Sequence, residues 1–228
     1  MTDATAPKIL TERRGHVLLI AFNRPEKYNA FDLEMHHQLA AAYGLLDRDP
    51  ELRCALVSAN GKAFTAGLEL TQWTPAFASG KWPDLADHER DPFGLIPEKR
   101  VSKPIIFAMH GICFTVAIEL ALAADIRVAA EDCRFGQIEV KRGIYAVGGG
   151  TVRMVQEFGW GNAQKYLLTG DEFNAAEALR IGLLIYDQVE LLDHAGPYEV
   201  FTCANRMQRR LAGDTSPPPF APRPEPEP

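Results

Sequence analysis

Two glutamates, Glu119 and Glu139, combine a side chain that can carry a proton with surroundings that suit acid–base chemistry. Each lies close to small residues that predict a turn or the beginning of a helix. The first N–H groups of a helix have no intrahelical acceptor, so they can stabilise negative charge on an oxygen atom. A carboxylate beside such donors could add or remove a proton next to a carbonyl group. The pair therefore indicates proton transfer on a carbonyl compound.

Each glutamate also has a simpler structural interpretation. Glu119 falls in the first turn of a helix predicted near Thr115, where a carboxylate complements the helix dipole without doing any chemistry. Glu139 could be an exposed loop residue, but its neighbours Ile138 and Ile144 are apolar. An apolar environment raises the pKa of a carboxyl group and lets it exchange a proton near neutral pH. The letters alone leave both interpretations open.

Other candidate residues carry weaker signals. In the segment GKAFTAGLEL at 61–70, Gly67 lets the backbone turn sharply and point an N–H group into a cleft. A plain turn after a strand explains the same letters. We expect His36 and His37 on the solvent side of a helix. His110 is expected either to line a pocket or to bond to the backbone at the end of a strand.

The elements that must position these residues alternate between strand and helix patterns, which predicts an α/β fold. Strands are expected at residues 8–13, 16–22, 53–59, 104–110, 126–129 and 133–135. Helices are expected at residues 29–46, 114–124, 148–158, 163–169 and 175–181. Residues 72–100 are rich in Trp, Pro and Gly and predict an excursion that ends in a helix. Loops of this kind often cover a pocket.

Length and composition fit a globular protein with one sizeable domain. The chain has 228 residues, 46% of them hydrophobic and 24% charged, and a formal net charge of −6 with both signs interspersed. This balance argues against nucleic acid or an anionic membrane as the main partner. Residues 1–15 lack a signal-peptide core, and no apolar run has the length of a membrane span. The four cysteines lack metal-site or disulfide-framework spacing, so we expect reduced thiols, no metal and a cytoplasmic protein.

Several ordered segments between about Ile9 and Leu183 resemble the crotonase (enoyl-CoA hydratase/isomerase) superfamily. They are NRPEKYNAF at 23–31, GKAFTAGLEL at 61–70, KPIIFAMHGICFTVAIELALAADIRVA at 103–129, FGQIEVKRGI at 135–144 and YLLTGDEFNAAEALRIGL at 166–183. The resemblance implies a crotonase-like ββα spiral within the α/β class. It also implies an acyl-CoA thioester as the ligand, and no cofactor beyond the coenzyme A of the substrate.

The resemblance assigns roles to particular residues. It places the acid/base pair of the family on Glu119 and Glu139, and the two oxyanion-hole N–H groups on Leu68 and Val116. It places contacts with the CoA moiety on Arg24, Lys27, Ala66, Leu68 and Leu70. In the family the glutamates position water and move a proton to or from Cα. The implied reaction is therefore the syn hydration of a 2-enoyl-CoA.

This chain departs from the family pattern just before its first glutamate. Hydratases of the family usually carry a run of glycines there, whereas this chain has Thr115, Val116 and Ala117. The branched side chain of Val116 is expected to crowd the thioester. Two alternatives to hydration stay open. One is a Δ3,Δ2-enoyl-CoA isomerase, which needs only one of the two glutamates, and the other is a non-catalytic acyl-CoA-binding remnant. Because both glutamates are kept, the sequence favours the hydratase.

The C-terminal part departs further. Residues 181–210 resemble the opening strand and helix of a PfpI-type, amidotransferase-like fold, joined to the first part at the shared IGL of 181–183. In the family, helices at this place complete the acyl-CoA site and build a homotrimer or homohexamer, so that assembly depends on elements that are replaced here. We therefore expect a crotonase-like domain at 1–183, a strand–helix extension at 184–211 and a disordered proline-rich tail at 212–228. Cys203 lacks a nucleophile elbow and is assigned no catalytic role.

Overall fold

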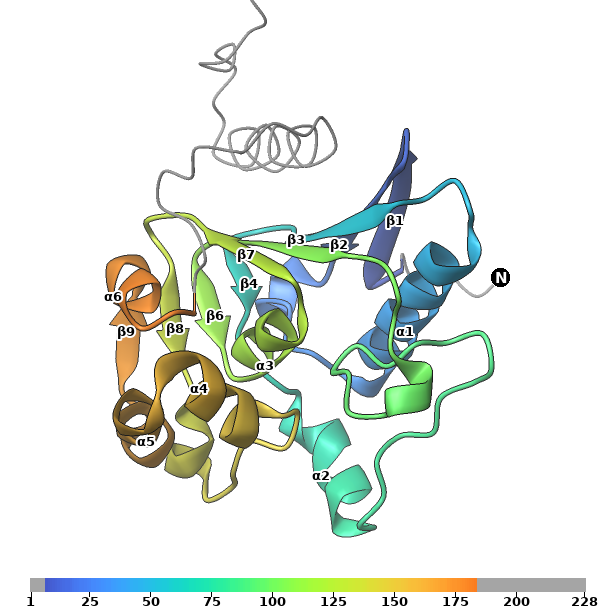
Figure 1. Cartoon of the computed structure of the whole chain (residues 1–228). Coiled ribbons are helices and arrows are strands. Elements are labelled where there is room, and N and C mark those ends of the chain that lie inside the picture. Colours follow the sequence, from blue (N-terminus) through green and yellow to red (C-terminus); the bar gives the residue numbers. More distant parts are fainter. Residues whose placement is uncertain (1–6, 184–228) are drawn as a thin grey trace, which may run out of the picture. The chain divides into compact units, whose positions relative to one another are not determined.

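The computed structural model describes residues 7–183, which form two β-sheets with helices packed against them (Figure 1). The strands are β1 Ile9–Arg14, β2 Val17–Phe22, β3 Cys54–Ala59, β4 Ala63–Thr65, β5 Ile105–Met109, β6 Ile112–Phe114, β7 Ile126–Ala129, β8 Arg134–Gly136 and β9 Glu172–Asn174. The α-helices are α1 Leu33–Arg48, α2 Leu70–Ala78, α3 Val116–Ala123, α4 Gly150–Phe158, α5 Trp160–Thr169 and α6 Ala175–Arg180. Short 3-10 helices are η1 Pro25–Lys27, η2 Pro97–Lys99 and η3 Ile138–Arg142.

The chain winds between the two sheets as a spiral. The first sheet has the strand order β1-β2-β3-β5-β7, and the second has the order β4-β6-β8-β9. Successive strand pairs, β3 with β4, β5 with β6 and β7 with β8, place one strand in each sheet. Within each sheet the strands of these pairs run parallel, while the hairpin β1–β2 and the pair β8–β9 are antiparallel. The predicted α/β class is confirmed, and the strands predicted at 8–13 and 16–22 form the antiparallel hairpin β1–β2.

Helix α1 begins at Leu33, four residues later than the predicted start at residue 29. Tyr28 and Asn29 adopt positive φ angles of 51° and 52°, which an α-helix excludes. The Asn29 side chain donates hydrogen bonds to backbone oxygens of neighbouring segments and accepts one from Arg24 N. Asp32 then caps the helix by accepting a hydrogen bond from Met35 N at 2.9 Å. Tertiary contacts of the preceding loop therefore decide where the helix starts.

The expectation that His36 faces solvent is wrong. His36 is completely buried on α1, and the aromatic rings packed around it belong to Phe31, Trp73, Trp82 and Phe93. Burial lowers the pKa of His36 to about 4, so the imidazole is neutral at physiological pH. His37, the next residue, stays half-exposed beside Glu89. The segment after β4 covers the helix face that the sequence pattern left open.

That covering segment differs from the expectation for residues 72–100. Its α-helix, α2, lies at the beginning of the segment, and the segment ends in the short 3-10 helix η2. Trp73 anchors α2, because its buried indole N–H donates a hydrogen bond to Phe31 O at 2.8 Å. Asp91 organises the later part by accepting hydrogen bonds from three backbone N–H groups. The excursion is thus held by specific contacts rather than by a terminal helix.

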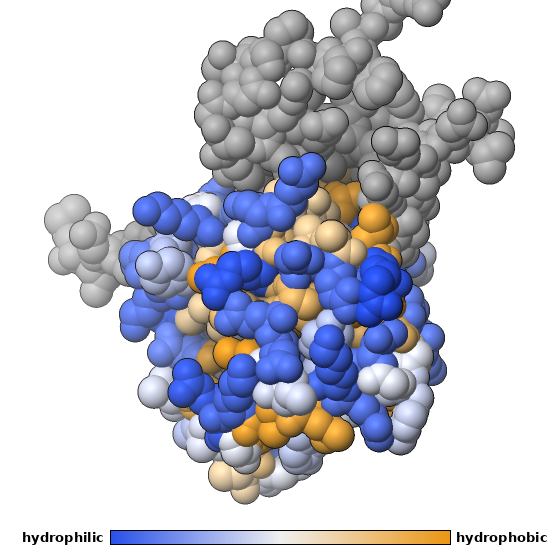
Figure 2. Space-filling view, turned by 90° about the vertical axis from the view of Figure 1, so that its left-hand side faces the viewer, coloured by the Kyte–Doolittle hydropathy of each residue, from blue (hydrophilic) through white to orange (hydrophobic). Residues whose placement is uncertain are grey.

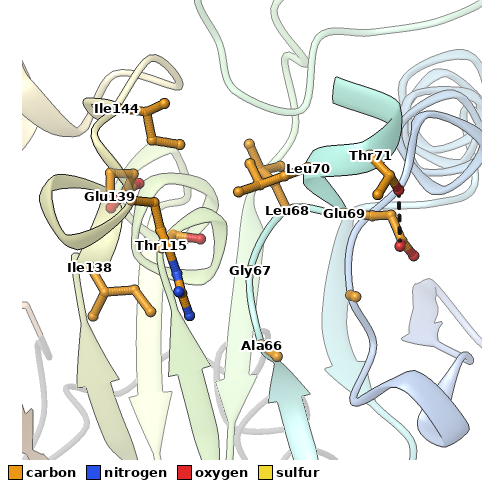
Figure 3. A pocket seen from close by; sticks show the side chains of 12 residues that line it. Ala66, Gly67, Leu68, Glu69, Leu70, Thr71, Thr115, Ile138, Glu139 and Ile144 are labelled. Atoms are coloured by element: carbon orange, nitrogen blue, oxygen red, sulfur yellow. Dashed lines mark hydrogen bonds between the residues drawn. The ribbon is translucent and has the colours of Figure 1, made fainter. Parts of the chain in front are cut away.

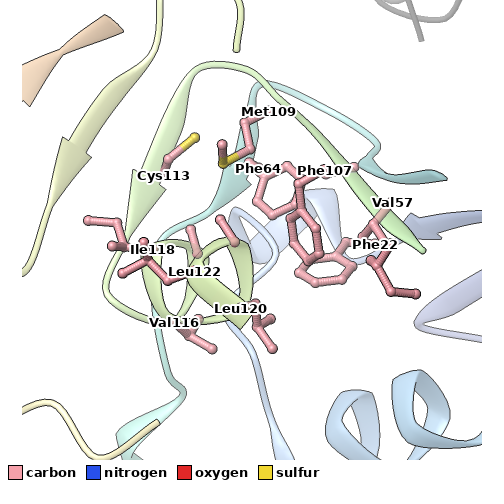
Figure 4. Packing of buried hydrophobic residues seen from close by; sticks show 14 of the residues in the cluster. Phe22, Val57, Phe64, Phe107, Met109, Cys113, Val116, Ile118, Leu120 and Leu122 are labelled. Carbon is pink, nitrogen blue, oxygen red and sulfur yellow. The ribbon is translucent and has the colours of Figure 1, made fainter. Parts of the chain in front are cut away.

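Helix α3 lies in the centre of the hydrophobic core (Figure 4). Every residue from Val116 to Leu122 is buried, although the helix has only eight residues. The rings of Phe22, Phe64 and Phe107 pack against one another near it, with centroid distances of 5.1 and 5.6 Å. A helix buried on all sides has no solvent face for a charged residue. Glu119 is nevertheless part of it, which singles this carboxylate out.

Helix α5 is buried only on one side. Ala163 and Tyr166 face the interior, whereas Trp160 and Leu168 are 66% and 68% exposed. The face of the molecule that lies on the left in Figure 1 is mostly hydrophilic, with hydrophobic areas between the polar side chains (Figure 2). No helix within residues 7–183 has the length and hydropathy needed to cross a membrane.

The strand–helix extension expected at 184–211, the tail expected at 212–228 and Cys203 lie outside the described residues. The three described cysteines, Cys54, Cys113 and Cys133, are buried and form no disulfide bond with one another.

Candidate active site

A cavity of about 460 Å³ opens between the β4–α2 turn, the beginning of α3 and the 3-10 helix η3 (Figure 3). Its wall is mainly apolar, with a few polar and charged side chains. The lining residues are Ala30, Ala66, Gly67, Leu68, Glu69, Leu70, Thr71, Thr115, Ile138, Glu139, Arg142 and Ile144. A cavity of this size and composition suits a small organic ligand.

The β4–α2 turn presents a backbone N–H group at the cavity. Gly67 has a φ of +110°, a conformation that favours glycine. Gly67 is fixed on both sides, because Phe31 N donates to its oxygen at 2.8 Å and its own N–H donates to Thr65 Oγ1 at 3.1 Å. Within residues 7–183 the next N–H group, that of Leu68, has no acceptor. The turn therefore holds a free donor where the sequence placed the first oxyanion-hole N–H.

The beginning of α3 presents a second such group. Val116 is the first residue of the helix, and its N–H finds no acceptor in the described part of the chain. The Val116 side chain is fully buried and packs in the core, where Figure 4 shows it, instead of lining the cavity. The crowding of the cavity expected from Val116 therefore does not occur. The side chain that lines the cavity at this place is that of Thr115.

Glu139 lines the cavity from η3 and is 6% exposed. Gln137 Nε2 donates a hydrogen bond to Glu139 Oε1 at 2.7 Å, while the buried Oε2 has no partner among residues 7–183. Burial raises the pKa of Glu139 to about 7, although hydrogen bonds, including that from Gln137, lower it in part. The predicted apolar environment and raised pKa of this carboxyl group are confirmed.

Glu119 lies just behind the cavity wall and is 2% exposed. Gly150 N donates a hydrogen bond to its Oε1 at 3.0 Å. Burial raises the pKa of Glu119 to about 7, and the charge of Glu139 contributes to the increase. The two carboxyl groups, twenty positions apart in the chain, are therefore close enough for the charge of Glu139 to affect the ionisation of Glu119.

The glycine run at 148–150 has a structural reason at this point. A Cβ atom added to Gly148 would stand 2.7 Å from Glu119 Oε2 and 2.6 Å from a ring carbon of Phe93. A Cβ atom on Gly150 would stand 3.1 Å from Glu119 Oε1. Small residues let the backbone approach the carboxylate closely enough to hydrogen-bond it. The run serves Glu119 and is not a nucleotide-binding loop.

The residues assigned to CoA contacts fall into two groups. Ala66, Leu68 and Leu70 line the cavity, as one wall that the β4–α2 turn supplies. Arg24 lies largely buried behind this turn, where its guanidinium donates to Ala30 O at 2.8 Å and to Glu69 at 2.6 Å. Lys27 is exposed at the end of η1. The structure thus brings three of the five residues to the cavity, while Arg24 braces the turn.

Three residues of the site were not assigned by sequence reasoning. Gln137 holds Glu139, Thr115 lines the cavity, and Arg142 supplies a cation that forms no ion pair within residues 7–183. Gln137 and Arg142 lie two positions before and three positions after Glu139, and this nearness was the available signal. Thr115 gave no signal of its own beyond standing where glycine was expected.

Comparison with known proteins agrees with this geometry. A model of the family described as enoyl-CoA hydratase/isomerase matches residues 12–196 of the chain. The chain belongs to this enoyl-CoA hydratase/isomerase family. A solved structure titled a probable enoyl-CoA hydratase/isomerase from Mycobacterium abscessus is 40% identical, with a TM-score of 0.75, and the match covers 90% of this chain and 76% of that one. The crotonase-like fold is thereby confirmed.

Two curated relatives of the chain are named as hydratases. A mevalonyl-coenzyme A hydratase, SIDH, from Beauveria bassiana is 42% identical over 171 residues, which are 72% of this chain and 60% of that protein. The enoyl-CoA hydratase EchA19 from Mycobacterium tuberculosis is 36% identical over 189 residues, which are 80% of this chain and 69% of that protein. The chain therefore spans about three fifths of the length of the first relative and about two thirds of the second. The resemblance proposed for residues 181–210 stays a prediction.

Proposed function

We propose that this protein is an acyl-CoA hydratase that adds water to the double bond of a 2-enoyl-CoA thioester. One observation carries the proposal: Leu68 and Glu139 line the same cavity. The N–H group of Leu68 has no acceptor within residues 7–183, and the carboxyl group of Glu139 has a pKa near 7. A second carboxyl group, that of Glu119, is buried within electrostatic reach of Glu139. The enzymes named among the relatives support the same class of reaction.

The two backbone donors would hold the thioester oxygen. Adding hydroxide to Cβ turns the thioester into an enolate, so negative charge develops on the carbonyl oxygen. The N–H groups of Leu68 and Val116 have no acceptor within residues 7–183 and come from two fixed elements, a braced turn and a helix start. Donors that are already oriented require no reorganisation when the charge appears. The loss of one such donor costs roughly 3–4 kcal/mol of transition-state stabilisation.

The glutamates would move the protons. With both pKa values near 7 and the charge of Glu139 helping to raise the pKa of Glu119, the state in which one carboxyl is protonated and the other ionised is well populated at neutral pH. The ionised carboxylate takes a proton from water as the hydroxide adds to Cβ, and the protonated one gives its proton to Cα. The syn addition that the family resemblance implies requires both groups to act from the same face of the substrate. One carboxyl group gains a proton and the other loses one, so atoms and charges balance without a metal ion or a redox partner.

The test is the ultraviolet absorbance of crotonyl-CoA, whose conjugated enoyl thioester loses its absorbance on hydration. We expect the wild-type chain to remove this absorbance and Glu139→Gln to lose nearly all turnover, because the amide cannot exchange the proton. Glu51→Gln, a change at an exposed position, is the matched control and should keep full turnover. A folded wild-type protein that leaves crotonyl-CoA unchanged would refute the hydratase.

A Δ3,Δ2-enoyl-CoA isomerase is the second candidate, and one observation favours it. Glu139 lines the cavity, whereas Glu119 does not reach its surface, so a reaction that uses one carboxyl group fits the geometry. Glu119→Gln separates the two. The hydratase should lose turnover, while an isomerase that uses Glu139 should still convert a 3-enoyl-CoA, seen as an increase in conjugated absorbance. A non-catalytic binder would instead bind acyl-CoA equally well after either substitution.

A further inference from the structure

Thr115 has a backbone conformation that is unusual for its side chain. Its φ is 48° and its ψ is −101°, a region that glycine enters freely and that a β-branched residue adopts only under strain. Thr115 N is fixed by donating to Gly136 O at 2.8 Å, and Thr115 O accepts hydrogen bonds from Ile118 N and Glu119 N. The surrounding elements therefore force this conformation on the residue. Strain of this kind collects at functional sites.

The hydroxyl group of Thr115 is also unsatisfied. The residue is 8% exposed, and its Oγ1 is buried without a hydrogen-bond partner in the described part of the chain. Most buried hydroxyl groups in proteins have a partner, and one without any destabilises the fold. Thr115 thus carries two destabilising features at once. Valine has nearly the same shape and would remove the second of them.

The position of the hydroxyl suggests what it could bind. A Cβ atom on Gly67 would stand 2.6 Å from Thr115 Oγ1, so the hydroxyl lies directly against the turn that carries the Leu68 N–H. Val116, the second proposed donor, is the next residue in the chain. Figure 3 shows Thr115 between Glu139 on one side and the Gly67–Leu68 part of the β4–α2 turn on the other. The hydroxyl therefore lies between the two segments that present the free N–H groups.

We propose that the Thr115 hydroxyl is a third donor to the thioester oxygen, acting beside the N–H groups of Leu68 and Val116. This inference rests on the proposed acyl-CoA site. Its O–H has no acceptor within residues 7–183, and rotation about the Cα–Cβ bond turns it along the cavity wall that Thr115 forms. A third hydrogen bond strengthens as charge develops on the oxygen, so it favours the enolate over the ground-state thioester. Thr115 then contributes mainly to kcat and little to KM.

The experiment uses the full chain and acetoacetyl-CoA, a 3-ketoacyl-CoA whose enolate has its own ultraviolet absorbance. The pH at which half of the bound ligand is enolate measures oxyanion stabilisation without any turnover. Thr115→Val keeps the shape and removes the donor, and we expect it to raise this pH by about one to two units, a 10- to 100-fold loss of enolate stabilisation. Thr115→Ser keeps the hydroxyl and should stay close to wild type.

Thr115→Gly removes both the strain and the hydroxyl. We expect it to unfold at a temperature at least as high as wild type and yet to show the same loss of enolate stabilisation as Thr115→Val. This combination separates a donor from a residue that only supports the fold, and it remains informative if Thr115→Val folds poorly. The proposal is overturned if the variants without a hydroxyl bind the enolate as wild type does, or if wild type does not stabilise the enolate at all.

The same experiment distinguishes failure of the proposed hydration from failure of this inference. If wild type stabilises the enolate through Thr115 but does not hydrate crotonyl-CoA, the donor is supported and the hydratase is refuted. If hydration proceeds and Thr115→Val changes neither kcat nor the enolate titration, the hydratase is supported and the donor is refuted.

Discussion

Glu119 is a residue whose ionisation works against the stability of the fold. Its pKa is raised from 4.5 to about 7, first by burial. Between these pH values the folded protein keeps a proton that the unfolded chain releases, so the free energy of unfolding falls as pH rises. The full effect, present above pH 7, is about 3 kcal/mol.

Replacing Glu119 by Gln should therefore stabilise the protein at alkaline pH. We expect the free energy of unfolding in urea to increase by up to about 3 kcal/mol at pH 8, and the difference from wild type to shrink toward pH 4. Glu51→Gln, at an exposed position, should show no such trend. A constant difference across the pH range would contradict burial as the cause.

Gln137 adjusts the second carboxyl group. Its hydrogen bond to Glu139 lowers the pKa of that group against the effect of burial. In Gln137→Ala the pKa of Glu139 should rise further, which moves the acidic side of the kcat profile to higher pH and lowers kcat several-fold at pH 7. Gln72→Ala, at an exposed position of α2, is the control. An unshifted pH profile with reduced kcat would point to a structural role instead.

At the scale of elements, the glycine run at the start of α4 controls where Glu119 can lie. Gly148→Ala would bring a Cβ atom to 2.7 Å from Glu119 Oε2 and 2.6 Å from a ring carbon of Phe93. We expect a loss of 1–3 kcal/mol in the free energy of unfolding, about as for other overpacked sites, and most of the turnover.

Gly161→Ala on α5 is the matched control for Gly148→Ala. No atom lies within 4 Å of an added Cβ at Gly161, and alanine favours a helix over glycine by about 1 kcal/mol. It should be neutral or stabilising in thermal unfolding, with unchanged turnover. If Gly148→Ala behaves like Gly161→Ala, close packing against Glu119 is needed neither for stability nor for turnover.

At the scale of the whole molecule, the packing of α1 against residues 70–99 depends on pH, because His36 is buried there. Its pKa falls from 6.5 to about 4, first through burial and then through the charge of His37, while Glu89 raises it slightly. Between these values the unfolded chain binds a proton that the folded chain lacks, so the free energy of unfolding falls as pH falls. The loss from pH 6.5 to pH 4 amounts to about 3 kcal/mol.

His36→Phe tests this coupling. Neither ring nitrogen of His36 has a hydrogen-bond partner within residues 7–183, so the substitution removes no hydrogen bond there. We expect equal or higher stability at pH 7 and a smaller decrease than wild type between pH 6.5 and pH 4. His37→Phe, at the half-exposed neighbouring position, should reduce the decrease only in part, because the charge of His37 contributes less than burial to the low pKa of His36. Because the glutamates shift stability in the opposite direction, the difference between variant and wild type is the quantity to compare.

Features that depend on a few neighbouring residues could be predicted from the sequence. The short apolar runs on either side of Gly15 predicted the two strands of the β1–β2 hairpin, and Gly67 predicted the turn before Leu68. The apolar neighbours Ile138 and Ile144 were enough to predict a raised pKa for Glu139. Strands β6 and β9 were missed, because three residues are too few to show a reliable period, although the equally short β8 was predicted at 133–135.

What only the tertiary structure decided are the contacts between distant segments. The late start of α1 depends on a loop whose Asn29 bonds to residues 60 and 63. The burial of His36 depends on a segment more than thirty positions away. The sequence by itself determined which residue types are present and the local conformations they favour. Whether Glu119, Glu139 and Thr115 meet was decided by the pairing of strands and the burial of α3, because burial and proximity are properties of the packed chain as a whole.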